Sequence, residues 1–157
     1  MASVIGYYSL VFGFCFSFLI ILFSIKNFRN SNIFDNKIIS LTFIQFFFVI
    51  ISFLGLILSF VNSDFSNQTV FNHSHTTKPL FYKISGTWGN HEGSLLLWVL
   101  ILTIFSFLFL LFNKNHPKNY RIYTLISQNF LILSFLFFIL FNSNPFSIVS
   151  PVPSEGL

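Results

Sequence analysis

Four long apolar runs, separated by polar stretches, set the organisation of this chain. They cover residues 4–25, 38–61, 94–112 and 122–141, and none contains Lys, Arg, His, Asp or Glu. A bilayer core about 30 Å thick needs roughly 20 helical residues, and a charge at its centre is costly. The pattern therefore predicts an all-α integral membrane protein, a single domain over residues 1–157 with four transmembrane helices in two hairpins.

Composition agrees with a lipid environment. The chain is 54% hydrophobic and 8% charged, whereas ordinary soluble domains are about 25% charged. Its 26 phenylalanines could not be hidden in a soluble core, because a domain of about 150 residues leaves roughly a third of its chain surface exposed. The first run lacks a basic leader and exceeds the roughly 7 to 15 apolar residues of a signal peptide, so we expect it to remain as a helix. A single cysteine, Cys15, excludes an intramolecular disulfide.

The basic residues predict how the helices are oriented. Six of the eight lie in the connectors after the first and third runs: Lys26, Arg29 and Lys37, then Lys114, Lys118 and Arg121. The excess of Lys and Arg on the cytoplasmic or matrix side of membrane proteins puts these connectors inside. Both termini, the loop 62–93 and the tail 142–157 are then predicted outside. The clusters form no extended basic face interleaved with aromatic residues, so we expect no nucleic-acid binding.

Candidate chemistry lies in the outer loop, which has about thirty residues without a periodic pattern, a length that usually indicates function or disorder. His73 and His75 form a His-x-His, and His91 and Glu92 follow near the third run. The spacing does not guarantee the three or four convergent ligands that a zinc site needs. Leu95 stands where a His-Glu-x-x-His motif requires its second histidine. We therefore predict no metal site.

The start of the third helix has two interpretations. Asn90 or Ser94 can cap it, Glu92 is favourable in its first turn, and the nearby glycines allow close backbone approach. His91, Leu95 and Trp98 fall near one helical face. An imidazole above an aromatic surface can hold a planar amphipathic ligand such as haem, but it can equally be an interfacial anchor.

Polar residues also occur inside two runs. Gln45 lies in the second, and Ser127, Gln128 and Asn129 lie in the fourth. Because a polar side chain facing lipid is costly, these residues are expected to face other helices and to form hydrogen bonds there. Structural hydrogen bonding is the first interpretation, and a conduction or substrate path is the alternative. The spans contain no acidic residue that could relay protons.

Two segments resemble the CcmF family, the membrane subunits of the cytochrome c maturation haem lyase. LFYKISGTWGNHEGSLLLWVLIL, residues 80–102, is similar to the family's T-W-G-x-H-E-G-S-L-L-L-W pattern, and LFFILFNSNPFSIVSPVPSEGL, residues 136–157, resembles its S-N-P-F segment with the following P-x-x-P and E-G. The resemblance covers the beginning of the family. The Trp-rich haem-handling segment and the paired haem-ligating histidines of longer members have no counterpart here. The chain thus resembles the N-terminal piece of a split, mitochondrial-type CcmF, or a truncated member.

The resemblance implies a function on the outer side of the membrane. The assembled machine would take haem from haem-loaded CcmE and attach it to apocytochrome c, with the remaining CcmF pieces and a CcmH-type apocytochrome chaperone as partners. This chain would supply support for a haem platform through Trp88, His91, Glu92 and Trp98, without catalytic residues or haem ligands of its own. The implied membrane is the mitochondrial inner membrane or a bacterial inner membrane. The alternatives are a non-catalytic assembly factor, a small respiratory-complex subunit and, third, a small transporter.

Overall fold

The computed structural model describes residues 1–29, 34–113 and 115–157. In this part of the chain, the long helices are α1 (Ala2–Arg29), α2 (Phe34–Val61), α5 (His91–Phe112) and α6 (Lys118–Asn142), with short helices α3 (Gln68–His73) and α4 (Leu80–Gly86) between α2 and α5. The four long helices are each long and apolar enough to cross a membrane, as the apolar runs predict. Residues 30–33 of the first predicted connector and the basic residue Lys114 of the second lie outside the described residues.

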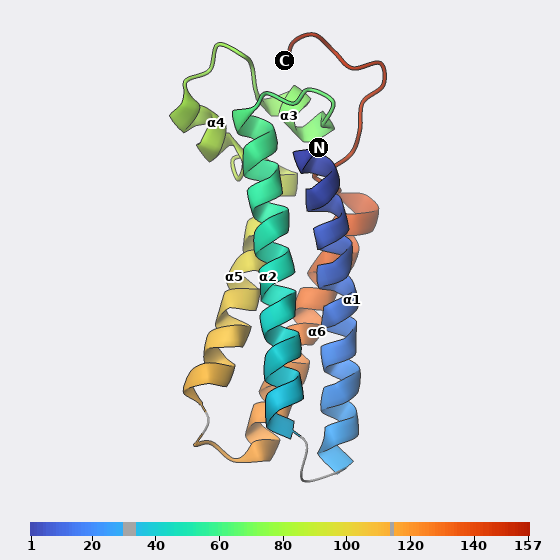
Figure 1. The fold of residues 1–157 in the computed structure, drawn as a ribbon, viewed down its shortest axis with the longest axis vertical. Helices are drawn as coiled ribbons and strands as arrows, with labels where there is room; N and C mark the ends of the chain where they lie inside the picture. The colour runs from blue at the N-terminus through green and yellow to red at the C-terminus, as the bar shows by residue number, and fades with distance from the viewer. Residues whose placement is uncertain (30–33, 114) are drawn as a thin grey trace.

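The long helices form a ring, with α1 packed against α2 and α6, and α5 packed against α2 and α6. Figure 1 shows neighbouring helices running in opposite directions, so α1–α2 and α5–α6 are the two predicted hairpins. Both chain termini lie at the same end of the bundle as α3 and α4. Many large apolar side chains, including Phe105, Phe130 and Phe141, are exposed on the outside of the bundle. Such a surface is suited to lipid tails.

The long helices extend beyond the apolar runs. The third begins at His91, as a cap at Asn90 predicts, the fourth begins at Lys118 rather than at residue 122, and the first two are also longer than their apolar runs. Hydropathy marks the part of a helix that suits the bilayer, whereas hydrogen bonding and capping decide where a helix begins. Asn90 caps α5 with its side chain, and Pro117 precedes the first residue of α6, where its fixed φ favours the helical start.

Two glycines bring α1 and α2 into close contact. A Cβ at position 55 would lie 3.0 Å from the Cα of Gly6 and 3.1 Å from the carbonyl oxygen of Ala2. Small residues at such crossings let helix backbones approach closely in membranes, where packing replaces the hydrophobic effect as the main source of association. The α1–α2 hairpin is therefore joined most tightly near the end that carries the termini.

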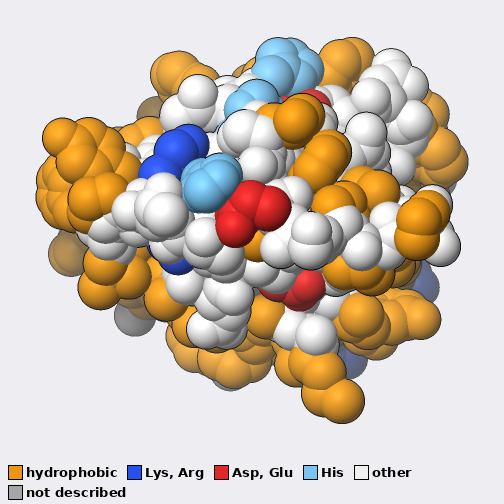
Figure 2. Space-filling model, turned by 90° about the horizontal axis from the view of Figure 1, so that it is seen from above, with side chains coloured by type: hydrophobic (Ala, Val, Ile, Leu, Met, Phe, Trp, Pro, Cys, Tyr) orange, Lys and Arg blue, Asp and Glu red, His pale blue; other side chains and the backbone are white. Residues whose placement is uncertain are grey.

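The loop 62–93, in which the sequence shows no periodic pattern, is folded. Residues 62–90, with α3 and α4, and the tail 143–157 together cover one end of the bundle, and we call them the cap. An isolated antiparallel bridge joins Asn67 in the loop to Ile148 in the tail. Figure 2, viewed onto this end, shows His, acidic and basic side chains among uncharged polar surface, with hydrophobic side chains towards the edge. The cap is thus the polar end of an apolar bundle.

Candidate functional site at the capped end

Asn90 joins α4 to α5. Its Oδ1 accepts a hydrogen bond from the backbone N–H of Gly93 at 2.7 Å, which makes it the N-cap of α5. Its Nδ2 donates to the carbonyl oxygens of Gly86 at 2.8 Å and Thr87 at 3.2 Å. Of the two predicted caps, Asn90 is therefore the correct one, while the hydroxyl of Ser94 donates to the carbonyl of His91. One side chain fixes the angle between the two helices.

Gly93 is required by a close backbone contact. A Cβ at this position would lie 1.6 Å from the carbonyl oxygen of Thr87, far inside van der Waals contact. At Gly89, in contrast, a Cβ would have the carbonyl oxygen of Ser85 as its nearest neighbour at 3.4 Å, an ordinary contact. The close approach predicted for the glycines of this segment is therefore concentrated at Gly93.

His91 connects the beginning of α5 to the end of α6. Its Nδ1 lies 3.0 Å from the hydroxyl of Ser143, a hydrogen bond whose donor depends on the imidazole tautomer. The ring also makes an edge contact with Phe138, at 6.5 Å between ring centroids and 74° between planes. The imidazole remains exposed despite these contacts. His91 is thus oriented by the protein and accessible from outside.

The other three candidates differ in position and exposure. Glu92 is half-buried in the first turn of α5, where the helix dipole favours its negative charge. Trp88 is 41% exposed and Trp98 is 58% exposed. Trp98 lies seven residues after His91 on α5, about 10 Å further along the helix axis. Each of the four side chains is therefore at least partly accessible.

These positions bear on haem and metal binding. Among the described residues, no three His, Cys, Asp or Glu side chains are placed to hold a metal ion. The Nδ1 of His91 is already engaged by Ser143, and both tryptophans are exposed. The exposure of His91 and the two tryptophans is compatible with a surface that contributes to a larger haem platform.

His73 is the last residue of α3, and His75 lies in the loop that follows. The Nδ1 of His75 lies 2.9 Å from the hydroxyl of Thr77 and 3.6 Å from Glu155. The carbonyl oxygen of His73 accepts a hydrogen bond from the ammonium of Lys78 at 2.8 Å. Both histidines therefore lie in the polar surface of the cap.

Asn67 joins the loop to the tail, a structural role that the sequence did not predict. Its Oδ1 caps α3 by accepting from the backbone N–H of Thr69 at 2.9 Å, and its Nδ2 donates to the carbonyl of Pro145 at 2.9 Å. Backbone hydrogen bonds from Gln68 to Ser147 and from Val149 to Ser66 continue the contact. An Asn directly before a short helical segment is a capping signal, but the contact with the tail has no local signature.

The end of the tail is held on the loop by Glu155. Its carboxylate accepts hydrogen bonds from the backbone N–H of Thr76 at 2.9 Å and from the hydroxyl of Thr76 at 2.8 Å. The backbone hydrogen bond from Thr76, followed by the hydroxyl, lowers the pKa of Glu155 below its ordinary value of 4.5. The next residues fit closely too, because a Cβ at Gly156 would lie 1.8 Å from the carbonyl of Ser74.

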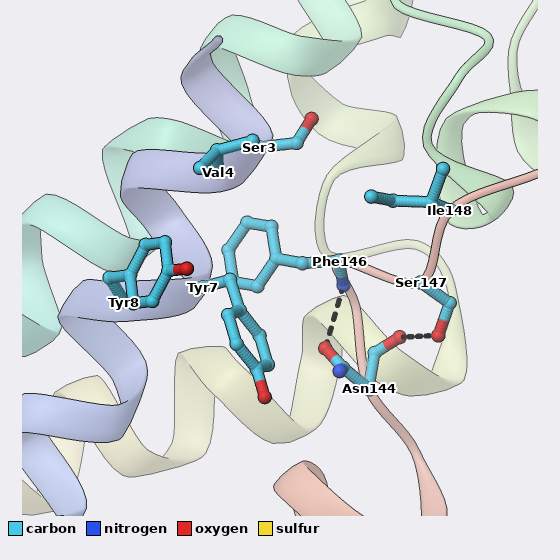
Figure 3. A pocket seen from close by; sticks show the side chains of 8 residues that line it. All are labelled: Ser3, Val4, Tyr7, Tyr8, Asn144, Phe146, Ser147 and Ile148. Carbon is cyan, nitrogen blue, oxygen red and sulfur yellow. Dashed lines mark hydrogen bonds between the residues drawn. The ribbon is translucent and has the colours of Figure 1, made fainter.

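The tail also packs against α1. Figure 3 shows the ring of Phe146 lying against this helix, and a Cβ at Gly6 would lie 2.4 Å from that ring. Asn144 shapes the turn, because its Oδ1 accepts from the backbone N–H of Phe146 at 2.9 Å. Beside Phe146, a cleft of about 440 Å³ is lined by the first turns of α1 and the tail: Ser3, Val4, Tyr7, Tyr8, Asn144, Phe146, Ser147 and Ile148.

Known proteins are similar to this chain in sequence and in fold. The chain is 48% identical over 111 residues to the cytochrome c-type biogenesis protein CycK of Rhizobium meliloti, covering 71% of this chain and 16% of that protein. It is 42% identical over 106 residues to the cytochrome c-type biogenesis protein CcmF of Escherichia coli, covering 67% of this chain and 16% of that protein. The chain is a relative of the CcmF proteins. No family model matches it.

A solved structure of the cytochrome c heme lyase CcmF has the same fold. It superposes with a TM-score of 0.83 over 94% of this chain and 25% of that structure's chain, at 23% sequence identity. The resemblance to CcmF and the integral membrane fold of four helices are therefore confirmed. The chain spans about a sixth of the length of the curated relatives it matches, and it fits the N-terminal piece of CcmF.

Polar residues inside the spans follow the predictions in part. Gln45 and Asn129 are fully buried among the helices, and Gln128 donates from Nε2 to the carbonyl of Leu102 on α5 at 3.1 Å. The prediction for Ser127 was wrong, because this residue is exposed. A serine can face lipid on a helix because its hydroxyl is able to bond to the carbonyl one turn back, as the exposed Ser134 does with Phe130 at 2.9 Å.

Proposed function

We propose that this chain is a membrane subunit of a cytochrome c-type haem lyase, which helps to attach haem to apocytochrome c. The observation that carries the proposal is the contact between the two segments that resemble CcmF. His91 of the first segment and Ser143 of the second lie 52 residues apart in sequence and are joined by a 3.0 Å hydrogen bond. The two segments that resemble CcmF thus contribute residues to one surface at the capped end.

The capped end faces the compartment where haem is attached, either the intermembrane space or the periplasm. The distribution of basic residues supports this orientation. Lys26 and Lys37 lie at the far ends of α1 and α2, and Lys118 begins α6 at the same far end of the bundle. Because basic residues are retained on the cytoplasmic or matrix side, both termini and the cap lie on the outer side.

The chain's own residues provide docking rather than catalysis. Ser143 and Phe138 orient His91, which leaves Nε2 of the imidazole for a partner. Glu92 and Trp88 add an acidic group and an indole at the same end, and Trp98 adds an indole further into the membrane. Haem, when bound in the assembled complex, supplies the vinyl groups that form the thioether bonds. Its iron ligands come from other subunits.

The partners follow from this role: the remaining CcmF pieces, a CcmH-type apocytochrome chaperone, haem-loaded CcmE and apocytochrome c. The chain is the N-terminal piece of a split CcmF, and its membrane is the mitochondrial inner membrane, with a bacterial inner membrane as the alternative. Both statements rest on the resemblance to the first part of CcmF.

Affinity purification of the tagged chain tests the proposal together with a deletion strain. We expect the other CcmF pieces to co-purify, and covalently bound haem in cytochrome c to be lost in the deletion strain. A purification that yields no CcmF piece, together with normal cytochrome c in the deletion strain, would contradict the proposal. Co-migration with a respiratory complex would instead favour the small-subunit alternative.

Replacement of His91 by alanine tests the docking role. We expect haem to remain in the purified complex while its attachment to apocytochrome c falls, because the imidazole positions a partner and does not ligate the iron. His116→Ala is a matched control, since His116 is an exposed histidine at the opposite end of the bundle. Loss of haem from the His91→Ala complex would show coordination and refute the docking role.

A further inference from the structure

The buried core of the bundle is divided into two hydrophobic clusters. One lies towards the cap and includes Leu56, Leu96 and Leu136. The other lies towards the opposite end and is built from Ile38, Leu110, Ile122 and Leu125. On three helices buried polar residues separate the clusters. They include Gln45 between Ile38 and Val49, Ser106 between Val99 and Leu110, and Asn129 between Leu125 and Ile132.

These residues lie at one level of the bundle. Counted from the helix ends at the cap, Gln45 is 16 residues from Val61, Ser106 is 15 from His91 and Asn129 is 13 from Asn142. With a rise of about 1.5 Å per residue, all three lie roughly 20 to 24 Å from the capped end. Ser17 on α1 joins them, because its hydroxyl donates to the carbonyl of Asn129 at 3.2 Å. We call these four residues the polar layer.

The polar layer is fully buried and only partly hydrogen-bonded. All four side chains have 0% exposure. Asn129 uses its Nδ2 to donate to the carbonyl of Leu125 at 3.1 Å. Within the described residues, however, both amide atoms of Gln45, the hydroxyl of Ser106 and the Oδ1 of Asn129 have no protein partner. Three helices thus bring unpaired donors and acceptors to the same level.

Elementary energetics makes this arrangement informative. Burying a polar group without a hydrogen bond is strongly unfavourable. In a membrane bundle, the surrounding lipid offers no hydrogen-bond partner either. Buried polar groups in native proteins are therefore paired, often through internal water that makes about three hydrogen bonds. An amide with two donors and an acceptor, a hydroxyl, and an amide oxygen supply the mixed donor and acceptor set that water needs.

We propose that the polar layer binds internal water between α2, α5 and α6, bonded to the amide of Gln45 and bridging it to Ser106 and to the Oδ1 of Asn129. This site joins the two hairpins near the middle of the membrane. It is independent of the haem-lyase function, because none of its residues lies in the cap.

Water contacts at the three glutamines provide the direct test. The chain contains Gln45, Gln68 and Gln128, so selective ¹⁵N-glutamine labelling in detergent micelles gives three side-chain amides. We expect a nuclear Overhauser cross-peak from the Gln45 amide protons to long-lived water. Gln68, which is exposed, should contact only rapidly exchanging surface water, and Gln128, which bonds to the carbonyl of Leu102, should show no long-lived water.

Thermal unfolding of variants gives an independent test of the shared water. Gln45→Met keeps the side-chain shape and should lower the Tm by about 2 to 4 °C, because Ser106 and Asn129 lose the shared water. Gln45→Met and Ser106→Ala should be non-additive, since both disturb one network. Gln128→Met should be additive with Ser106→Ala. A missing Gln45 cross-peak, with a Tm raised by Gln45→Met, would overturn the proposal by showing amide groups that are buried without a partner.

Discussion

The two ends of the bundle are organised by different physics. At the capped end, segments far apart in sequence are joined by hydrogen bonds between particular atoms: His91 with Ser143, Asn67 with Pro145, and Thr76 with Glu155. Among the described residues at the opposite end, Ile38, Leu110, Ile122 and Leu125 form a small aliphatic cluster, Arg121 is buried, and the side chain of Asn113 bonds locally, to the carbonyl of Phe109 one turn back. The capped end is thus joined by hydrogen bonds between distant segments, whereas the clearest described feature of the opposite end is an aliphatic cluster.

This difference teaches where substitutions should matter. Aliphatic packing tolerates changes of shape when volume is kept. Few residues can replace Gly93, which lies against the carbonyl of Thr87, or Asn90, whose side chain makes three hydrogen bonds. The two segments that resemble CcmF both reach the capped end. We therefore expect variants of the cap to cause larger losses than chemically matched variants elsewhere.

The largest expected effect is that of Gly93→Ala. The new Cβ would lie 1.6 Å from the carbonyl of Thr87, so α4 and α5 must separate, and we expect a loss of about 3 kcal/mol or more. Thermal unfolding in detergent micelles measures it, together with covalent haem in cytochrome c. Gly89→Ala is the matched control, because its Cβ would make an ordinary contact. Equal stability of the two variants would show that the close contact does not limit the fold.

The next effect compares asparagines at the two ends. Asn90→Ala removes the N-cap of α5 and two bonds to α4, which we expect to cost about 2 kcal/mol. Asn113→Ala removes one bond to the carbonyl of Phe109, which should cost about 0.5 kcal/mol. Asn90→Asp keeps the capping oxygen and should fall between them. Similar unfolding temperatures for Asn90→Ala and Asn113→Ala would remove the distinction between the ends.

A smaller effect is expected from Ser143→Ala. The variant removes the hydrogen bond to His91, worth about 1 kcal/mol, and frees the imidazole to adopt other orientations. Haem attachment to apocytochrome c should fall towards the level of His91→Ala, and Ser143→Thr should restore it. Ser94→Ala is the control, because its hydroxyl bonds only to the carbonyl of His91 within the same helix turn. Unchanged attachment in Ser143→Ala would mean that His91 needs no orientation.

The sequence predicted the spans better than the folded loop at the capped end, for a physical reason. The four spans and their pairing follow from apolar length, which the bilayer requires of any crossing helix. The cap of α5 was also predicted, since Asn90 acts on residues three positions away. The folded loop was missed because α3 is held through contacts between Asn67 and the tail, nearly eighty residues apart in sequence. No local pattern encodes such a contact.

The partial failure inside the spans has a related cause. Burial of Gln45 and Asn129 could be predicted because exposed amides are costly in lipid. The exposure of Ser127 could not be predicted, since a serine hydroxyl can bond to its own helix. His91, Glu92 and Trp88, the residues that the sequence nominates as platform support, all lie at the capped end, and their role stays a prediction. The geometry of the site was not predicted, because Ser143, which orients His91, follows the end of α6 and lies 52 residues away in sequence.

The smallest expected effect concerns the tail and depends on pH. The hydrogen bonds from Thr76 lower the pKa of Glu155, so the ionised carboxylate favours the docked tail. A group with a lowered folded-state pKa stabilises the fold above its ordinary pKa and loses this contribution as the pH falls through the lowered value. The tail should therefore stay docked at neutral pH and loosen below about pH 4.5, the ordinary value.

Hydrogen exchange of the Leu157 amide, which bonds to the carbonyl of Phe71 at 2.8 Å, reports this docking. Its protection, corrected for the intrinsic exchange rate at each pH, should fall in acid, and Glu155→Gln should reduce protection at neutral pH and flatten the pH dependence. Glu92→Gln, which changes a carboxylate on α5, should leave the profile of Leu157 unchanged. If Glu155→Gln kept the wild-type acid profile, the pH dependence would have to come from another group, and Glu155 would hold the tail through shape rather than charge.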